Sequence, residues 1–233
     1  MSIVFVLTDK GWKDEQSLKS GDGVYCFDPK CWGLDFTTID EMVDVSNQLT
    51  YKLVNRQTNY TAYINQDSRV HIVNDLTNVC YPSDINSVTA RYLDVGVYIP
   101  CSFKCVTDNV RQTSPHSNTN FARQVKMRDI GLVDFDMSPA YARQLIDAWK
   151  TQYQRLNAVD YNQASMIQMV ALKGGYCSKI EPEIGFVVKV IDVPFVRVTD
   201  IKISDSVKIN RHFYHNGTPI SVVRLVDGQV MIG

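Results

Sequence analysis

The chain has 233 residues, of which 45% are hydrophobic and 21% charged, and its 24 basic and 25 acidic side chains leave a formal net charge of −1. These proportions are ordinary for a soluble globular protein, and the length suits one large domain or two small ones. The charge balance excludes a global basic excess that would draw the chain to nucleic acid.

No stretch approaches the roughly 20 apolar residues that a membrane-spanning helix needs. The N-terminus lacks the basic region of a signal peptide, and its apolar run is too short for one. The sequence therefore predicts no membrane association. We expect the chain in a cytoplasm, or in something that is assembled there.

Short segments rich in valine, isoleucine, tyrosine and threonine dominate the first hundred residues. β-Branched and aromatic side chains favour the pleated surface of a sheet. Turns at residues 10–11 and 21–23 contain glycine, and their spacing is typical of a compact all-β unit. The sequence predicts strands at residues 3–8, 24–27, 49–54, 60–64, 69–73 and 92–100.

A polar stretch without periodicity, residues 107–120, predicts a long loop or linker. A helix is expected to begin at Ser138-Pro139, because serine is a favoured N-cap and proline suits the first helical position. A second helix is predicted over residues 162–173, ending at Gly174-Gly175. The inward-facing residues are predicted to be Ala142, Leu145, Ile146, Trp149 and Tyr153 in the first helix, and Ile167, Val170 and Ala171 in the second.

Strands are predicted again at residues 185–192, 195–199 and 201–203. The chain closes on a hairpin, with strands at residues 221–225 and 229–232 joined by an Asp-Gly turn at 227–228. His212 and His215 could form a metal pair if their segment turns. A hairpin is favoured instead, in which the two imidazoles face opposite sides of one strand.

Six cysteines are present, and without a secretory signal reduced thiols are the expected state. Two closely spaced pairs could be read as halves of a zinc site. Their flanking residues indicate strands rather than the tight turns of such sites, so small buried thiols are the favoured interpretation. The pairs are Cys26/Cys31 and Cys101/Cys105, and the remaining cysteines are Cys80 and Cys177.

Three separated stretches resemble parts of an intein, the self-splicing domain of the Hint fold, with an inserted LAGLIDADG homing-endonuclease module. The first comprises residues 6–13 and 20–28, with a short strand, a Gly-Trp turn and a Gly-Asp pair. The second is residues 138–180, in which residues 145–148 (Leu-Ile-Asp-Ala) resemble the core of the LAGLIDADG helix. The third is the closing hairpin, residues 222–233.

The resemblance implies an α+β fold that is mostly β, a Hint-like β core interrupted by an α/β LAGLIDADG-like module. It divides the chain into residues 1–106, the N-terminal part of the Hint-like domain, and residues 107–195, the degenerate insert. Residues 196–233 would supply the strands that complete the Hint-like domain.

The residues that the family uses for splicing are missing or replaced. The nucleophile at the start of the domain would lie ahead of Met1, and Ser2 falls at the wrong place in its strand to replace it. Ser68 stands where the family has its TxxH histidine, and a hydroxyl cannot carry protons near neutral pH as imidazole does. His71 is interpreted as a strand residue. The terminal asparagine would be residue 234, one beyond Gly233.

The nuclease part departs from its family in a similar way. LAGLIDADG enzymes hold a divalent cation with an acid at the end of the motif helix. The resemblance places Trp149-Lys150 there, or residues 151–153 in variant helices, and neither supplies an acid. Asp147 falls one turn too early, the glycine for close helix packing is absent, and no second motif is recognisable before residue 138.

These losses predict a protein that is not an enzyme, with no catalytic, cofactor-binding or metal-binding residues and no cofactor. The predicted function is a non-catalytic structural or interaction protein on a domesticated intein-like scaffold. We expect a phage virion component, such as a head, neck or tail decoration protein, assembled in the host cytoplasm. Its partners would be phage structural proteins or further copies of itself, and 12 tyrosines are consistent with such contacts.

The alternative is a DNA-binding homing-endonuclease relative with weak or no nuclease activity. It is not favoured, because acids stand beside the basic groups that would form the DNA-binding face. Residual autoprocessing, a third hypothesis, needs a precursor longer than this chain, and an apparent start at Met1 speaks against it. The basic groups are Lys173/Lys179 and Arg123/Lys126/Arg128, and the neighbouring acids are Asp129, Glu181 and Glu183.

Overall fold

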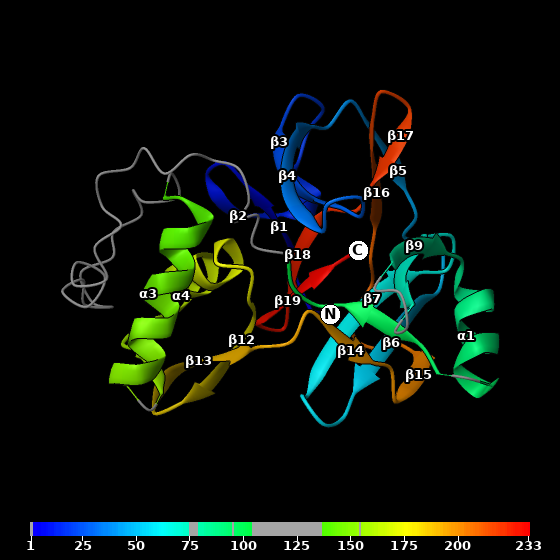
Figure 1. The fold of residues 1–233 in the computed structure, drawn as a ribbon. Helices are drawn as coiled ribbons and strands as arrows, with labels where there is room; N and C mark the ends of the chain where they lie inside the picture. Colours follow the sequence, from blue (N-terminus) through cyan, green and yellow to red (C-terminus); the bar gives the residue numbers. More distant parts are fainter. Residues whose placement is uncertain (1, 75–78, 95, 104–136, 154) are drawn as a thin grey trace. The chain divides into compact units, whose positions relative to one another are not determined.

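The computed structural model describes residues 2–74, 79–94, 96–103, 137–153 and 155–233. The chain divides into two compact units (Figure 1). Unit 1 combines Met1–Cys101 with Phe195–Gly233, and unit 2 is the continuous segment Ser102–Pro194. The sequence predicts the corresponding borders after residues 106 and 195, and the first of these lies outside the described residues.

Strand β1 (Val4–Thr8) lies at the centre of the largest sheet of unit 1, and its burial reflects its apolar sequence VFVLT. It pairs with β18 on one side and with β2 and β3 on the other. The closing hairpin is confirmed, since Asp227 and Gly228 both have positive φ, as a two-residue turn of this type requires. The partners are β2 (Gly11–Asp14), β3 (Gly23–Asp28), β4 (Gly33–Thr38), β18 (Val223–Val226) and β19 (Gln229–Ile232).

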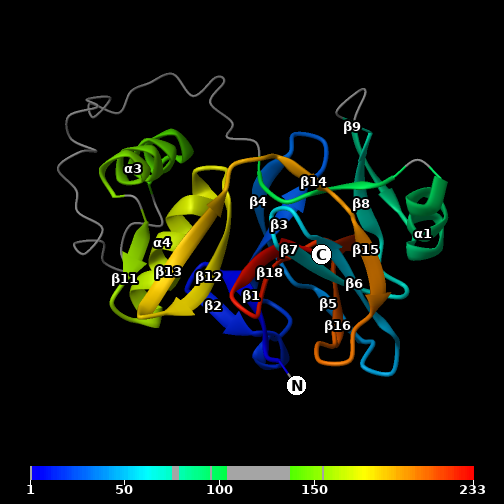
Figure 2. The ribbon, with the colours of Figure 1, turned by 90° about the horizontal axis from the view of Figure 1, so that it is seen from below.

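Three smaller sheets complete unit 1, and Figure 2 shows them from below. Two follow the orders β14-β10-β8-β9 and β15-β6-β7, and the third follows β17-β16-β5. Their strands are β5 (Glu41–Asp44), β6 (Thr50–Asn55), β7 (Tyr60–Asn65), β8 (Val70–Asn74), β9 (Val79–Ser83), β10 (Tyr98–Pro100), β14 (Phe195–Arg197), β15 (Asp200–Ile203), β16 (Arg211–His215) and β17 (Thr218–Ile220).

The predicted strand over residues 92–100 is wrong in its first part, because α1 (Ile85–Asp94) includes its beginning and only β10 is extended. Asp84 caps this helix: its carboxylate accepts from the backbone N–H of Ser87 at 2.9 Å, and its carbonyl accepts from Val88 N–H at 3.0 Å. Because the residues from Tyr92 onward are rich in strand-forming side chains, the sequence predicts a strand there, and Asp84 was not recognised as the N-cap of a helix. A short 3-10 turn, η1 (Glu15–Ser17), follows β2.

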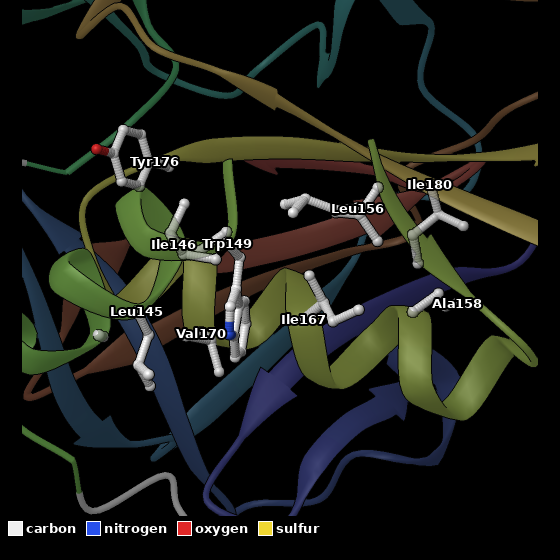
Figure 3. Close-up of a cluster of buried hydrophobic side chains, with 13 residues drawn as sticks. Leu145, Ile146, Trp149, Leu156, Ala158, Ile167, Val170, Tyr176 and Ile180 are labelled. Carbon is white, nitrogen blue, oxygen red and sulfur yellow. The ribbon is translucent and has the colours of Figure 1, made fainter. Parts of the chain in front are cut away.

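Unit 2 contains the two predicted helices. α3 (Pro139–Gln152) begins at Ser138, whose Oγ accepts from the backbone N–H of Tyr141. α4 (Tyr161–Lys173) begins after Asp160, which caps it in the same way, and ends at Gly174. The labelled side chains of the two helices, β11 and β12 gather in one apolar cluster (Figure 3). Its members include Ala142, Leu145, Ile146, Trp149, Ile167, Val170 and Ala171, so the predicted inward faces are confirmed, with Tyr153 partly buried against them.

The predicted fold class, a β core interrupted by an α/β module, is wrong. The described residues form a mainly β fold with 19 strands and three α-helices. β12 (Cys177–Glu183) and β13 (Gly185–Ile191) make a tight antiparallel hairpin, and β11 (Leu156–Ala158) pairs antiparallel with β13. The helical periodicity of residues 138–173 was real, but the residues that follow alternate as an antiparallel sheet. The first part of the predicted insert lies outside the described residues.

Gly174 allows the end of α4 to approach α3 closely. A Cβ atom at this position would lie 2.9 Å from the backbone nitrogen of Arg143 and 3.0 Å from its Cα. Backbone atoms cannot yield as a flexible side chain can, so only glycine fits here. The sequence predicts Gly174 only as a helix stop, whereas it is also the point of closest helix packing.

Candidate functional site

A buried ion pair lies at the centre of unit 1. Arg224 Nε donates to Glu15 Oε1 at 3.0 Å, and the two side chains are only 4% and 1% exposed. Burying two charges is costly unless each is paired and fully hydrogen-bonded. The remaining polar atoms of this pair must therefore have further partners.

Those partners come from several segments of the chain. Glu15 Oε2 accepts from the backbone N–H of Asn210 at 3.1 Å. Arg224 donates through Nη2 to the carbonyl of Arg211 at 2.9 Å and through Nη1 to the carbonyl of Gly233, and its guanidinium lies over the ring of Phe213. The pair thereby links η1, β16, β18 and the end of β19, which indicates a structural role for this centre.

His71 and Ser221 form a second polar contact in unit 1. His71 Nε2 lies 2.9 Å from Ser221 Oγ, and the imidazole packs edge-on against Phe27. A nucleophile beside a base is the arrangement that hydrolases use, but they orient the base with a third group. His71 Nδ1 is buried and has no hydrogen-bond partner among the described residues. Within the part of the chain that the structure describes, this pair therefore has no acid to orient it as in a triad.

A small cavity next to His71 is lined mainly by apolar side chains. Its volume of about 10 Å³ is room for about one water molecule. Burial lowers the pKa of His71 to about 4, so the imidazole is neutral near pH 7 and is a weak base. The lining residues are Leu53, Ala62, Ile64, Val70, His71, Ile99, Pro100 and Ile232.

We expect His71 to make unit 1 sensitive to acid. Its pKa is about 4 in the folded chain and about 6.5 when unfolded, so only the unfolded state binds the proton between these values. The stability that neutral His71 contributes is present above pH 6.5 and is lost as the pH falls towards 4. Between pH 7 and pH 5 the loss is about 2 kcal/mol. Urea unfolding at both pH values measures it, and His71→Gln should abolish that part of the pH dependence; an unchanged dependence would contradict the assignment.

Ser68 and His212 are brought together although 144 residues separate them. Ser68 Oγ lies 2.9 Å from His212 Nε2. Burial, followed by the charge of Arg224, lowers the pKa of His212, so this imidazole too favours its neutral form. Ser68, which the sequence resemblance would place at the position of the intein histidine, is here the partner of a histidine from β16. Ser2 contributes its backbone N–H to the carbonyl of Ser206 at 3.0 Å.

His215 has different surroundings from His212. The two lie on β16 three residues apart, and the predicted hairpin is confirmed by the pairing of β16 with β17. His215 Nδ1 lies 3.0 Å from the carbonyl of Thr38 and 3.2 Å from Asp40 Oδ2, and Nε2 lies 3.0 Å from Asn216 Nδ2. The two imidazoles therefore do not converge on one ligand site.

Asp147 of unit 2 is engaged by a tyrosine. Tyr176 Oη donates to Asp147 Oδ1 at 2.5 Å, and Arg143 and Lys150 lie over the Tyr176 ring, 4.7 and 5.2 Å from its centroid. Burial and the neighbouring carboxylate raise the pKa of Tyr176, so its hydroxyl remains a donor. Lys150 also pairs with Asp192 at 3.0 Å. The carboxylate of Asp147 thus stabilises the contact between α3 and the start of β12.

The described cysteines lie in separate surroundings. Burial raises the pKa of Cys26 and Cys80 to about 12, and that of Cys101 likewise, so these thiols are protonated near neutral pH. Cys31 is exposed and donates to Asp28 at 3.2 Å. In the part of the chain that the structure describes, no three His, Cys, Asp or Glu residues gather as metal ligands would. Cys105 lies outside that part.

The basic residues considered for DNA binding lie partly outside the described residues, and Lys179 lies beside an acid. Arg123, Lys126 and Arg128 lie outside the described residues. Lys179 lies 4.0 Å from Glu181, which also pairs with Lys189 at 2.5 Å. The charges on this face of the β12–β13 hairpin are thus of both signs.

An exposed apolar surface lies at one end of unit 2, and we call it the hairpin patch. Ile184 forms the turn between β12 and β13 and is fully exposed, at 108% of its reference area, and Val159 is 84% exposed. The ring of Tyr161, 42% exposed, meets the ring of Phe186 edge-on at 5.7 Å. Pairing of Ala158 with Phe186 brings these residues together. The hairpin patch consists of Val159, Tyr161, Ile184 and Phe186.

Comparison with known proteins gives no relative. No family model matches the chain, and neither the curated proteins nor the solved structures include a significant match. The intein-like resemblance therefore stays a prediction. Among the described residues, no helix is long and apolar enough to cross a membrane.

Sequence reasoning missed the buried ion pair and the hairpin patch. The ion pair was missed because Glu15 is one of several charged residues in a polar segment, and because Arg224 lies in a strand that is otherwise apolar. That interruption was a usable signal, because an arginine flanked by buried strand residues on both sides needs a buried partner. Ile184 stands in the sequence EPEIGF. An apolar residue beside a glycine in a predicted turn could have indicated an exposed apolar side chain.

Proposed function

We propose that this chain is a non-catalytic structural or interaction protein, and that the hairpin patch of unit 2 is its contact surface for another protein. The observation that supports this most directly is the exposure of Ile184 and Val159 beside two aromatic rings. Exposed apolar side chains that group in one region mark interaction sites, whereas single exposed apolar residues are ordinary.

The surroundings of the hairpin patch suit a protein partner. Tyrosine and phenylalanine are enriched at the centre of protein interfaces, and charges belong to the rim. Arg155 and Glu183 pair at 2.8 Å beside the patch, with side chains 65% and 39% exposed, and so supply such a rim. The partner surface that fits is apolar at its centre, with charges around it that complement this pair.

The type of assembly rests on the sequence resemblance alone. We propose a phage virion component, bound to phage structural proteins or to further copies of itself. The DNA-binding alternative has less support in unit 2, because Glu181 pairs with both Lys179 and Lys189 and so offsets their positive charge. A DNA complex would weaken steeply with added salt, whereas an apolar contact would not.

Ile184→Glu and Val159→Glu test this proposal. Each places a charge in the proposed contact, and losing a central contact weakens binding by about tenfold or more. The measurement is quantitative mass spectrometry of the proteins that co-purify, at fixed stoichiometry, with the chain expressed from its own genome. Ile3→Glu is the matched control, since Ile3 is 58% exposed and lies in unit 1. Retention of the same partners by both patch variants, or recovery of nucleic acid without proteins, would contradict the proposal.

A further inference from the structure

The tip of the β16–β17 hairpin carries the only Asn-Gly dipeptide in the sequence. Asn216 and Gly217 form the turn, with φ values of 49° and 69°, and both are exposed. Glycine leaves the peptide nitrogen after the asparagine without a neighbouring side chain. Apart from Gly217 itself and its two chain neighbours, nothing lies within 4 Å of the place where a Gly217 Cβ would stand. That nitrogen is therefore accessible for attack on the asparagine side chain.

A histidine and a carboxylate lie against the same asparagine. His215 Nε2 is 3.0 Å from Asn216 Nδ2, and His215 Nδ1 is 3.2 Å from Asp40 Oδ2. Because the Thr38 carbonyl and Asp40 both accept hydrogen bonds, Nδ1 carries the proton of the neutral imidazole and Nε2 is free to accept one. Asp40 Oδ2 also accepts from the backbone N–H of Asn216 at 2.6 Å, which holds the three side chains together.

We propose that Asn216 is a self-modification site, at which the chain converts this asparagine to aspartate and isoaspartate with the help of His215. The Gly217 nitrogen attacks Asn216 Cγ, a bond forms between them, and the Cγ–Nδ2 bond breaks. The Gly217 nitrogen loses its proton, Nδ2 gains one and leaves as ammonia, and a five-membered succinimide remains. Water then opens this ring at either carbonyl, which gives aspartate or isoaspartate without any redox change.

His215 touches a reacting atom and acts as the catalytic residue of this reaction. The nitrogen that leaves needs a proton. The Gly217 nitrogen gives its proton to water, and His215 Nε2, 3.0 Å from Nδ2, takes one up from water and passes it to the leaving nitrogen. Asp40 is a positioning residue, because it holds the imidazole through Nδ1, as an acid does for the histidine of a triad. The new carboxylate would stand beside Asp40, so conversion adds a negative charge at this edge of unit 1.

Asn59 provides an internal comparison. It is exposed and has a φ of 54°, close to that of Asn216, but Tyr60 follows it and is fully buried. A bulky side chain on the next residue hinders attack by its nitrogen. The proposal therefore predicts conversion at Asn216 and not at Asn59 in the same sample.

The experiment is timed incubation of the freshly purified full chain at neutral pH and physiological temperature, followed by peptide mass spectrometry that separates asparagine, aspartate and isoaspartate. We expect conversion at residue 216, at a rate about tenfold lower in His215→Gln, since removing a general acid–base group costs at least this much. Asp40→Asn should slow the reaction, and Asp40→Glu should restore part of the rate, which a merely structural role would not do. The Asn216→Asp variant provides the reference peptide for the aspartate product in the mass spectrometry.

Two results would overturn the proposal. One is an equal rate of conversion in the wild-type chain and in His215→Gln, with both folded by circular dichroism. The other is conversion in the urea-unfolded chain while residue 216 of the folded chain stays intact, since the hairpin would then protect Asn216. If His215→Gln fails to fold, a comparison of the folded wild-type and unfolded chains decides alone, and only faster conversion in the folded chain upholds the proposal.

Discussion

Replacing Glu15 by alanine is expected to lower the free energy of unfolding by about 3–5 kcal/mol, because it leaves the guanidinium of Arg224 buried without its counter-charge. The carboxylate also holds the backbone N–H of Asn210, so that donor loses its acceptor as well. Hydrogen–deuterium exchange of peptides from unit 1 during urea unfolding measures the effect in the unit that contains the pair.

The controls for this prediction are a second ion pair and a double substitution. Lys13 and Asp22 pair at 2.7 Å with side chains 38% and 29% exposed, so Lys13→Ala should cost less than about 1 kcal/mol. Substituting methionine for both Glu15 and Arg224 removes the two buried charges together and should cost less than Glu15→Ala alone. A loss in Glu15→Ala no larger than in Lys13→Ala would contradict the structural role of this centre.

The elements that the sequence predicted well are those fixed by local chemistry. Ser138-Pro139 defines the start of α3, and Asp227-Gly228 defines the last turn, because each depends on residues that are neighbours in the chain. α1 was missed because Tyr92 and the apolar residues after it favour strands by composition, while its cap at Asp84 outweighed that preference. Whether strand propensity or a helix cap prevails at such a segment depends on contacts with the rest of the fold, which the local sequence does not contain.

The candidate sites depend on contacts between distant parts of the chain, which one sequence does not reveal. Glu15 and Arg224 are 209 residues apart, and His71 and Ser221 are 150 apart. No spacing rule relates such positions. The sequence instead directed attention to Asp147, which the structure places in a hydrogen bond with Tyr176. A residue type that matches a motif therefore says little until its partners are known.

The fold class failed for a different reason. The apolar spacing of residues 138–173 correctly indicates two helices, and a strand was predicted at residues 185–192. The error lay in assigning residues 107–195 to an α/β module without recognising the strand at residues 177–183. Strand β12 contains Lys179, Glu181 and Pro182, so its composition gave a weak strand signal. Its stability comes from seven paired positions with β13, from Cys177 opposite Ile191 to Glu183 opposite Gly185.

Trp149→Ala is the second substitution for which a large effect is expected. Trp149 is fully buried at the centre of the apolar cluster of unit 2, and truncating such a side chain costs about 3–5 kcal/mol through lost burial and the cavity that remains. Hydrogen–deuterium exchange should show α3 and α4 losing protection. Peptides of β1 and β18 should keep it, since unit 1 has its own core around Val6, Val24 and Phe213.

Trp149→Phe is the matched variant, because it keeps a large aromatic ring in the cluster and should cost clearly less than the alanine substitution. This comparison separates loss of packing from any other role of Trp149, the residue that the sequence resemblance would place where LAGLIDADG enzymes have an acid. The hairpin patch gives a further readout, since Phe186 packs against the same cluster and its ring meets that of Tyr161. If packing is the role of Trp149, partner binding should fall in Trp149→Ala and be largely kept in Trp149→Phe. Equal losses of stability in both variants would contradict this assignment.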